Sequence, residues 1–101
     1  MLRHLFEPIT INQTEIKNRI VYPSLNLLYS HDGHLTPRHE AFFRARARGG
    51  AGIVTVGPVG IGMSGSNPST LKLESDFDIP AFASLVKIIQ SQGAKAWIQL
   101  F

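Results

Sequence analysis

Apolar and polar residues alternate in two places near the start of the chain, and this period of two predicts β-structure. Residues 9–17 (ITINQTEIK) alternate on both sides of a central turn, which predicts a small hairpin. Residues 20–22 (IVY) are β-branched or aromatic and precede Pro23, which predicts a short strand that ends there. The following segment has no clear period and carries a turn signal at Asp32-Gly33, so we expect a long loop.

Two later segments predict helices. Residues 36–37 (Thr-Pro) are typical of a helix start, and this helix should run to about Arg48 and end at glycines 49 and 50. A second helix should begin between residues 76 and 80 and end at Gly93. Its apolar stripe has the spacing i, i+3, i+4, i+7 and consists of Phe82, Leu85, Val86 and Ile89.

Two further runs predict the remaining strands of the fold. Residues 52–57 (GIVTVG) are apolar and β-branched, as in a strand buried on both faces, and residues 95–100 (KAWIQL) predict the third strand. Residues 58–75 predict a long loop with a short extended piece around Leu71 and Leu73. The order strand, helix, strand, helix, strand predicts an α/β fold with parallel strands and right-handed crossovers. The long loops follow the strands, and the chemistry of such folds sits at these carboxyl ends.

The glycine-rich stretch around the second strand does not fit a phosphate-binding loop. A P-loop needs a lysine after its last glycine, and no lysine lies between positions 17 and 72. Gly60, Gly62 and Gly65 spell G-x-G-x-x-G, but the next expected helix starts more than ten residues later. We therefore expect the glycines from 57 to 65 to relax a surface loop.

Length and composition indicate one ordinary folded unit spanning residues 1–101. Apolar residues make up 44% and charged residues 17% of the chain. The absence of cysteine excludes a disulfide framework, a thiolate metal site and a cysteine nucleophile. No apolar run is long enough to span a membrane, and the first residues lack the features of a secretory signal, so we expect no membrane partner and a cytoplasmic location.

The net charge of +3 comes largely from the first helix, which carries Arg38, Arg44, Arg46 and Arg48. Arg44 and Arg48 share one face of that helix while Arg46 points elsewhere, and Glu40 is spaced for an ion pair with Arg44. This pattern favours a solvated helix face over a nucleic-acid site, so we expect no nucleic-acid partner.

Several motifs occur in order along almost the whole chain: LF-x-P, I-K-N-R-I-V, D-G-x-x-T, R-A-x-G-G-A-G, and Q-G-A-K followed by Q-L. Together they resemble the start of the old yellow enzyme family, FMN-dependent NAD(P)H:flavin oxidoreductases that include ene-reductases and the barrel domain of 2,4-dienoyl-CoA reductases. The resemblance implies the first three βα units of a TIM (β/α)₈ barrel, with an N-terminal β-hairpin that closes its amino-terminal end. It also implies FMN across the carboxyl ends of the strands, and hydride transfer from NAD(P)H through FMN to an activated alkene.

The same resemblance implies which residues contact the flavin. Four candidates end the first strand: Pro23, Ser24, Leu25 and Asn26. Ser24 stands where many members have proline, and Asn26 replaces the usual Thr, Cys or His, although an asparagine amide still donates to a carbonyl oxygen. The small residue that ends the second strand falls on Pro58, which offers only packing or its carbonyl, and Gln99 matches the glutamine that binds the pyrimidine edge of the flavin.

Other polar residues have simpler interpretations. His31 and His34 flank Asp32 but lack a third well-placed ligand, so we expect no metal site, and Ser64 and Ser66 lack a His-Asp arrangement. We expect Tyr29 to be a loop residue, and we expect three aromatic residues in the core: Phe42, Phe43 and Trp97.

The residues that the family uses for substrate anions, proton donation and the FMN phosphate belong to later strands, so we expect no catalytic residue here and no turnover by this chain alone. Three strands leave open sheet edges, at which a second copy would be able to pair. Two alternatives stay open: a non-catalytic α/β binding or oligomerisation module, and half of a doubly wound nucleotide-binding sheet with strand order 3-2-1.

Overall fold

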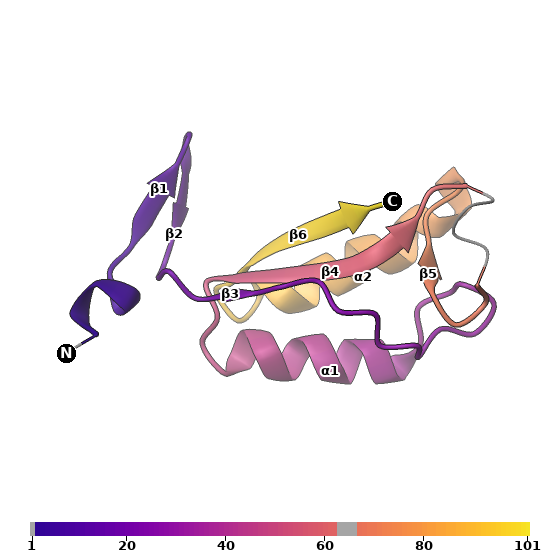
Figure 1. The fold of residues 1–101 in the computed structure, drawn as a ribbon, viewed down its shortest axis with the longest axis horizontal. Helices are drawn as coiled ribbons and strands as arrows, with labels where there is room; N and C mark the ends of the chain where they lie inside the picture. The colour runs from indigo at the N-terminus through magenta and orange to yellow at the C-terminus, as the bar shows by residue number, and fades with distance from the viewer. Residues whose placement is uncertain (1, 63–66) are drawn as a thin grey trace.

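The computed structural model describes residues 2–62 and 67–101 and contains a parallel sheet covered on one face by two helices (Figure 1). The sheet strands are β3 (Val21–Tyr22), β4 (Ile53–Gly60), β5 (Leu71–Lys72) and β6 (Lys95–Leu100), and the helices are α1 (Pro37–Arg48) and α2 (Ile79–Gln90). The predicted order of strands and helices is confirmed. Within the described ranges, neither helix has the length and hydropathy needed to cross a membrane.

The predicted hairpin is formed by β1 (Ile9–Ile11) and β2 (Thr14–Ile16), which pair antiparallel. Asn12 makes the turn with a φ of 55°, a left-handed conformation that asparagine tolerates. A short 3-10 helix, η1 (Arg3–Phe6), precedes the hairpin. Figure 1 shows the hairpin beyond the end of the sheet at which the strands begin, as the barrel resemblance implies.

Three strands run side by side in the order β3-β4-β6, and β5 pairs with the far end of β4. All three pairings are parallel, with Val21 opposite Ile53 and Ile53 opposite Lys95. This order is common to consecutive barrel strands and, read backwards, to half of a doubly wound sheet. Strand order alone therefore does not separate these two architectures.

Strand β4 is longer than its sequence indicated. It continues through the cis Gly57-Pro58 peptide bond to Gly60, and its pairing with β6 shifts register between Val56 and Val59. The expectation that glycines from 57 onward belong to a loop is wrong for residues 57–60. The extension pairs with β5, which confirms the predicted short extended piece: Val59 lies opposite Leu71.

Helix α1 begins and ends at the predicted residues. His39, in its first turn, accepts a hydrogen bond at Nδ1 from the backbone N–H of Thr36 at 3.1 Å, and Gly50 ends the helix region with a φ of 111°. The ion pairs among the described residues do not join Glu40 to Arg44. Two other arginines of α1 stack on aromatic rings instead: Arg38 on Tyr29 and Arg46 on Phe42.

Helix α2 follows a 3-10 turn, η3 (Asp76–Asp78), in agreement with the predicted start. The carboxylate of Asp78 is buried and accepts hydrogen bonds from the backbone N–H groups of Glu74, at 2.9 Å, and Ser75, at 3.2 Å. These two bonds hold the pKa of Asp78 below its ordinary value of 3.8, and the bond from Glu74 has the larger effect. The nearby His34 and Lys72 lower the pKa further.

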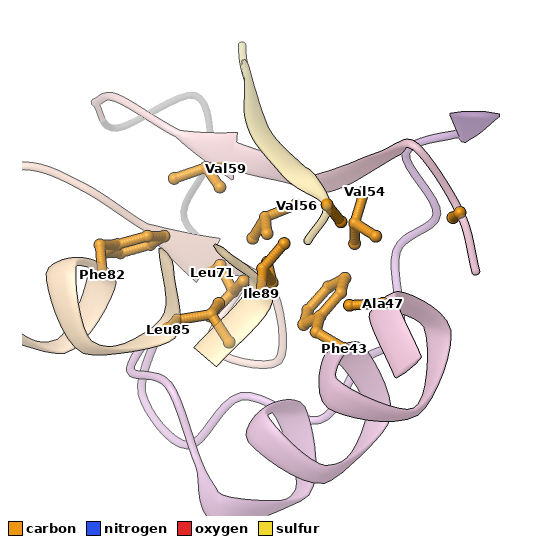
Figure 2. Close-up of a cluster of buried hydrophobic side chains, with 11 residues drawn as sticks. Phe43, Ala47, Val54, Val56, Val59, Leu71, Phe82, Leu85 and Ile89 are labelled. Atoms are coloured by element: carbon orange, nitrogen blue, oxygen red, sulfur yellow. The ribbon is translucent and has the colours of Figure 1, made fainter. Parts of the chain in front are cut away.

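The core lies between the helices and one face of the sheet, where the labelled side chains of Figure 2 point toward one another. β4 contributes Val54 and Val56, α2 contributes Ile89 and α1 contributes Phe43, all at most 1% exposed. Phe42 packs against this core as predicted, but the prediction for Trp97 is wrong because it is 47% exposed. Trp97 lies opposite Thr55, on the sheet face that the helices do not cover.

Gly52 marks a close approach between the start of β4 and the segment after the hairpin. A Cβ at this position would lie 2.6 Å from Asn18 Oδ1 and 2.7 Å from Asn18 O. The Asn18 side chain is itself fixed, since its Nδ2 donates to Gly50 O at 2.7 Å and its Oδ1 accepts from Ile20 N. The absence of a side chain at residue 52 therefore allows the start of β4 to lie against the Asn18 segment.

We predict that Gly52→Ala lowers the free energy of unfolding by roughly 1–3 kcal/mol, because the added methyl group must displace a hydrogen-bonded side chain and backbone. Gly62→Ala is the matched control, since nothing lies within 4 Å of its Cβ position. The control should be neutral or stabilising by up to about 1 kcal/mol. Urea unfolding followed by circular dichroism measures both, and equal effects of the two substitutions would contradict the close approach at Gly52.

We also predict a pH-dependent contribution from Asp78. Because its folded pKa is lowered, its stabilisation is present above the unfolded pKa and is lost as the pH falls through the folded value. Asp78→Asn should therefore cost about 1 kcal/mol at pH 7 and almost nothing once the native carboxyl is protonated. The control is Asp76→Asn, at an exposed position of the same turn. Urea unfolding from pH 7 to pH 2 measures the difference, and a pH-independent loss would contradict this role.

Candidate functional site

The two long loops that follow β3 and β4 are tied to each other at the carboxyl end of the sheet. The backbone N–H of Gly33 donates to Pro68 O at 2.8 Å, and that of Lys72 donates back to Gly33 O at 2.9 Å. Gly33 follows Asp32 in a tight turn with positive φ at both residues, which confirms the predicted turn signal. These bonds are formed by backbone groups, so they hold the turn at Gly33 independently of its side chains.

The four candidates after β3 differ in how they face solvent. Pro23 and Asn26 are exposed and Leu25 is 58% exposed, so these three can meet a ligand directly. The hydroxyl of Ser24 is buried and has no hydrogen-bond partner. It lies 3.2 Å from the point that a Cβ of Gly57 would occupy, so it faces β4 rather than the solvent. A ligand at this rim would meet the backbone of Ser24 before its side chain.

Asn26 already has two hydrogen bonds within the chain. Its Nδ2 donates to Thr70 Oγ1 at 3.0 Å, and its Oδ1 accepts from the backbone N–H of Leu28 at 3.3 Å. The first bond joins the loop after β3 to the segment before β5. The amide nitrogen keeps a second hydrogen, so Asn26 has one donor left for a ligand at this edge.

Gly57 lies between the ends of the other strands. Its φ is 144°, and a Cβ there would lie 2.9 Å from the backbone oxygen of Gln99 as well as 3.2 Å from Ser24 Oγ. The structure therefore brings Ser24, just after β3, and Gln99 of β6 together around one glycine of β4. Gly57 was not predicted as a site residue, although its period-two relation to Ile53 and Thr55 places it on the sheet face away from the helices.

Pro58 and Gln99 complete the predicted set. Pro58 is half-buried inside β4, not after it, and lines a small pocket together with Leu25 and Asn26. The side chain of Gln99 is exposed near the end of β6. Its amide offers a donor and an acceptor side by side, while the exposed Trp97 lies two residues before it on the same face of the strand.

His39, which was not predicted as a site residue, also lines the pocket of Leu25, Asn26 and Pro58. It is 2% exposed, and burial lowers its pKa below the ordinary 6.5. The available signal was its position three residues after Thr36, where a side chain reaches back to the helix start.

The remaining candidates from the sequence are the histidines beside Asp32, considered for a metal, and the serines considered for a Ser-His-Asp triad. His31 and His34 pair as an isolated antiparallel bridge, and His34 Nδ1 lies 3.8 Å from Asp78 Oδ1. In residues 2–62 and 67–101, no group of three potential metal ligands comes together. The candidates at positions 64–66, namely Ser64, Gly65 and Ser66, lie outside the described residues.

This arrangement fits a flat ring system with polar edges. Two amides, from Asn26 and Gln99, are placed at the carboxyl ends of different strands, and both can donate and accept. Between them, Gly57 has no side chain that would lift a ring from the strand ends. Leu25 and Trp97 add exposed apolar surface. These are the groups that the isoalloxazine ring of FMN would need, with alternating donors and acceptors at one edge and an apolar face.

Comparison with known proteins identifies the family. The profile of the NADH:flavin oxidoreductase / NADH oxidase family matches residues 4–101. The chain is 40% identical over 103 residues to an NADPH dehydrogenase of Bacillus subtilis (strain 168), covering 99% of this chain and 30% of the relative. It is 37% identical over 97 residues to a metal reductase of Desulforamulus reducens, covering 96% of this chain and 14% of the relative.

Solved structures agree on the fold. The chain superposes on a 2-naphthoyl-CoA reductase in complex with 2-naphthoyl-CoA with a TM-score of 0.93 and 26% identity, covering 99% of this chain and 16% of that one. It superposes on old yellow enzyme from Pichia sp. AKU4542 with a TM-score of 0.88 and 21% identity, covering 97% and 26%. The chain thus spans less than a third of the length of these relatives. Because the family profile matches nearly every residue, the chain belongs to the NADH:flavin oxidoreductase / NADH oxidase family.

Proposed function

We propose that this chain supplies the first three βα units, and one part of the flavin-binding rim, of an FMN-dependent NAD(P)H oxidoreductase that reduces activated alkenes. The observation that carries the proposal is the convergence of Ser24, which follows β3, with Gly57 of β4 and Gln99 of β6, near the carboxyl ends of three adjacent parallel strands. The family profile and the relatives named NADPH dehydrogenase support the cofactor and the reductant. When bound, FMN would accept a hydride from NAD(P)H and pass it to the alkene.

The residues of this chain would bind and orient the ring. We assign Gln99 to the pyrimidine edge, where its carbonyl oxygen accepts from a ring N–H and its NH₂ donates to a ring carbonyl. Asn26 would donate its remaining amide hydrogen to a flavin carbonyl. Pro23, Leu25 and Pro58 would contact the ring by packing, and Ser24 through its backbone.

The uncovered sheet face and edges also bear on the partners of this chain. β3 and β6 each have one side without a strand neighbour, and the exposed apolar residues of β6 are Trp97, Ile98 and Leu100. We propose that these edges pair with further strands of a barrel. In the absence of such strands, they would pair with a second copy of the chain. We further propose a single unit over residues 1–101, a cytoplasmic location, and no nucleic-acid or membrane partner.

We predict that the chain alone, mixed with FMN and NADPH, shows no NADPH oxidation, because three strands cannot enclose the ring. A hybrid in which the chain replaces its aligned segment of the Bacillus subtilis NADPH dehydrogenase should bind FMN stoichiometrically and oxidise NADPH. Flavin absorbance and NADPH consumption measure both proteins. Turnover by the isolated chain, or a folded hybrid without flavin, would overturn the proposal.

Within that hybrid, we predict that Gln99→Leu weakens FMN binding by about ten- to a hundredfold, because two hydrogen bonds of about 1 kcal/mol each are lost at similar side-chain volume. Gln90→Leu, at an exposed position of α2, is the matched control and should leave affinity unchanged. Fluorescence titration of FMN measures the dissociation constants. Equal affinity of the Gln99 variant and the unmodified hybrid would reject the assignment of Gln99.

A further inference from the structure

His39 joins the start of α1 to the loop that carries Pro23–Asn26. Its Nδ1 accepts from the backbone N–H of Thr36 at 3.1 Å and lies 3.0 Å from Thr36 Oγ1. The same hydroxyl donates to the backbone oxygen of Tyr29 at 3.3 Å, so one imidazole and one threonine connect the helix start to the end of the loop.

The ring of His39 also contacts the loop directly. The Tyr29 ring meets it edge-on, with centroids 5.7 Å apart, and Arg38 stacks on the Tyr29 ring at 3.9 Å. His39 lines the pocket with Leu25 and Asn26 on one side and Gly57 and Pro58 of β4 on the other. Replacing this ring would therefore alter the packing of the loop against β4 at the predicted flavin contacts.

We infer that His39 is a positioning residue: its neutral imidazole sets the place of the loop over residues 25–30 relative to the end of β4. This role of His39 applies to the chain without any ligand. Only the statement that the loop then binds flavin rests on the proposed function. Because Nδ1 accepts from a backbone N–H, the proton of the neutral ring is on Nε2. Protonation at Nδ1 would remove the bond from Thr36 N and place a charge in a buried site.

The groups around His39 favour the neutral ring. The Tyr29 ring packs edge-on against the imidazole. The same pocket is lined by Asn26 and Ser30 of the loop, by Phe43 of α1, and by Gly57, Pro58 and Leu71 of β4 and β5. Arg38 stacks on the Tyr29 ring, and among the described residues no carboxylate, lysine or arginine side chain lines the pocket. Burial likewise lowers the pKa of His39. Acidification should therefore release the loop before it unfolds the core.

Amide hydrogen exchange of the chain without FMN tests the inference, because the loop contains two reporter bonds. Leu28 N–H donates to Asn26 Oδ1 and Ser30 N–H donates to Ser69 O, whereas Thr36 N–H reports the helix start. His39→Ala should lower protection at all three amides, by about tenfold or more. His39→Gln keeps an acceptor for Thr36 N–H and should restore protection there, but not at Leu28 and Ser30.

The pH profile provides the second readout. In the native chain, protection at Leu28 and Ser30 should fall as the pH is lowered through a midpoint below 6.5, and this step should vanish in His39→Gln. His31→Gln, at an exposed position of the same loop, is the control and should retain the step. Full recovery of Leu28 and Ser30 in His39→Gln, or an unchanged pH step, would reduce His39 to a helix cap and overturn the inference. A failure to bind FMN would reject only the proposed function, since these measurements use no flavin.

Discussion

The structure depends on the packing of β4 against the two helices. β4 is the central strand, its backbone is paired on both sides, and its Val54 and Val56 pack in the core between the sheet and the two helices. Parallel sheets normally have both faces covered, whereas the helices here cover one. Near the start of the strands, the hairpin lies next to the opposite face, and its Ile16 lines a pocket with Ile53. Near the strand ends this face is open to solvent, and Trp97 and Gln99 are exposed there. That uncovered end is the candidate site.

The elements were predictable from the sequence because their signals are local. Thr36-Pro37 and the apolar stripe of α2 specify helices, and the β-branched run of β4 specifies a buried strand. Two features depend on tertiary contacts and were missed. A Gly-Pro dipeptide usually marks a turn or loop. Here β4 continues through Gly57-Pro58, because β5 pairs with it at Val59. Trp97 is exposed because only the other face of β6 meets a helix, and residue type alone does not say which face is covered.

The candidate site was predictable in outline but not in detail. The resemblance placed flavin contacts at the strand ends, and the structure places Ser24 and Gln99 there on either side of Gly57. The conformation of Ser24 was not predictable, since its hydroxyl turns toward β4 only because a glycine leaves room for it. The bond from Asn26 to Thr70 spans 44 positions in the sequence, and no local pattern encodes such a contact.

The two amides at the rim should contribute differently to binding a flat ligand. Asn26 is held by bonds to Thr70 and Leu28, so little conformational entropy remains for it to lose when a ligand binds. Gln99 is exposed on an edge strand and must be ordered by the ligand itself. The first loop therefore acts as a preformed wall, held by the hydrogen bonds of Asn26 and by the packing of His39. Gln99 would order only when a ring edge reaches it, so closure of this rim would depend on whatever covers the open side of β6.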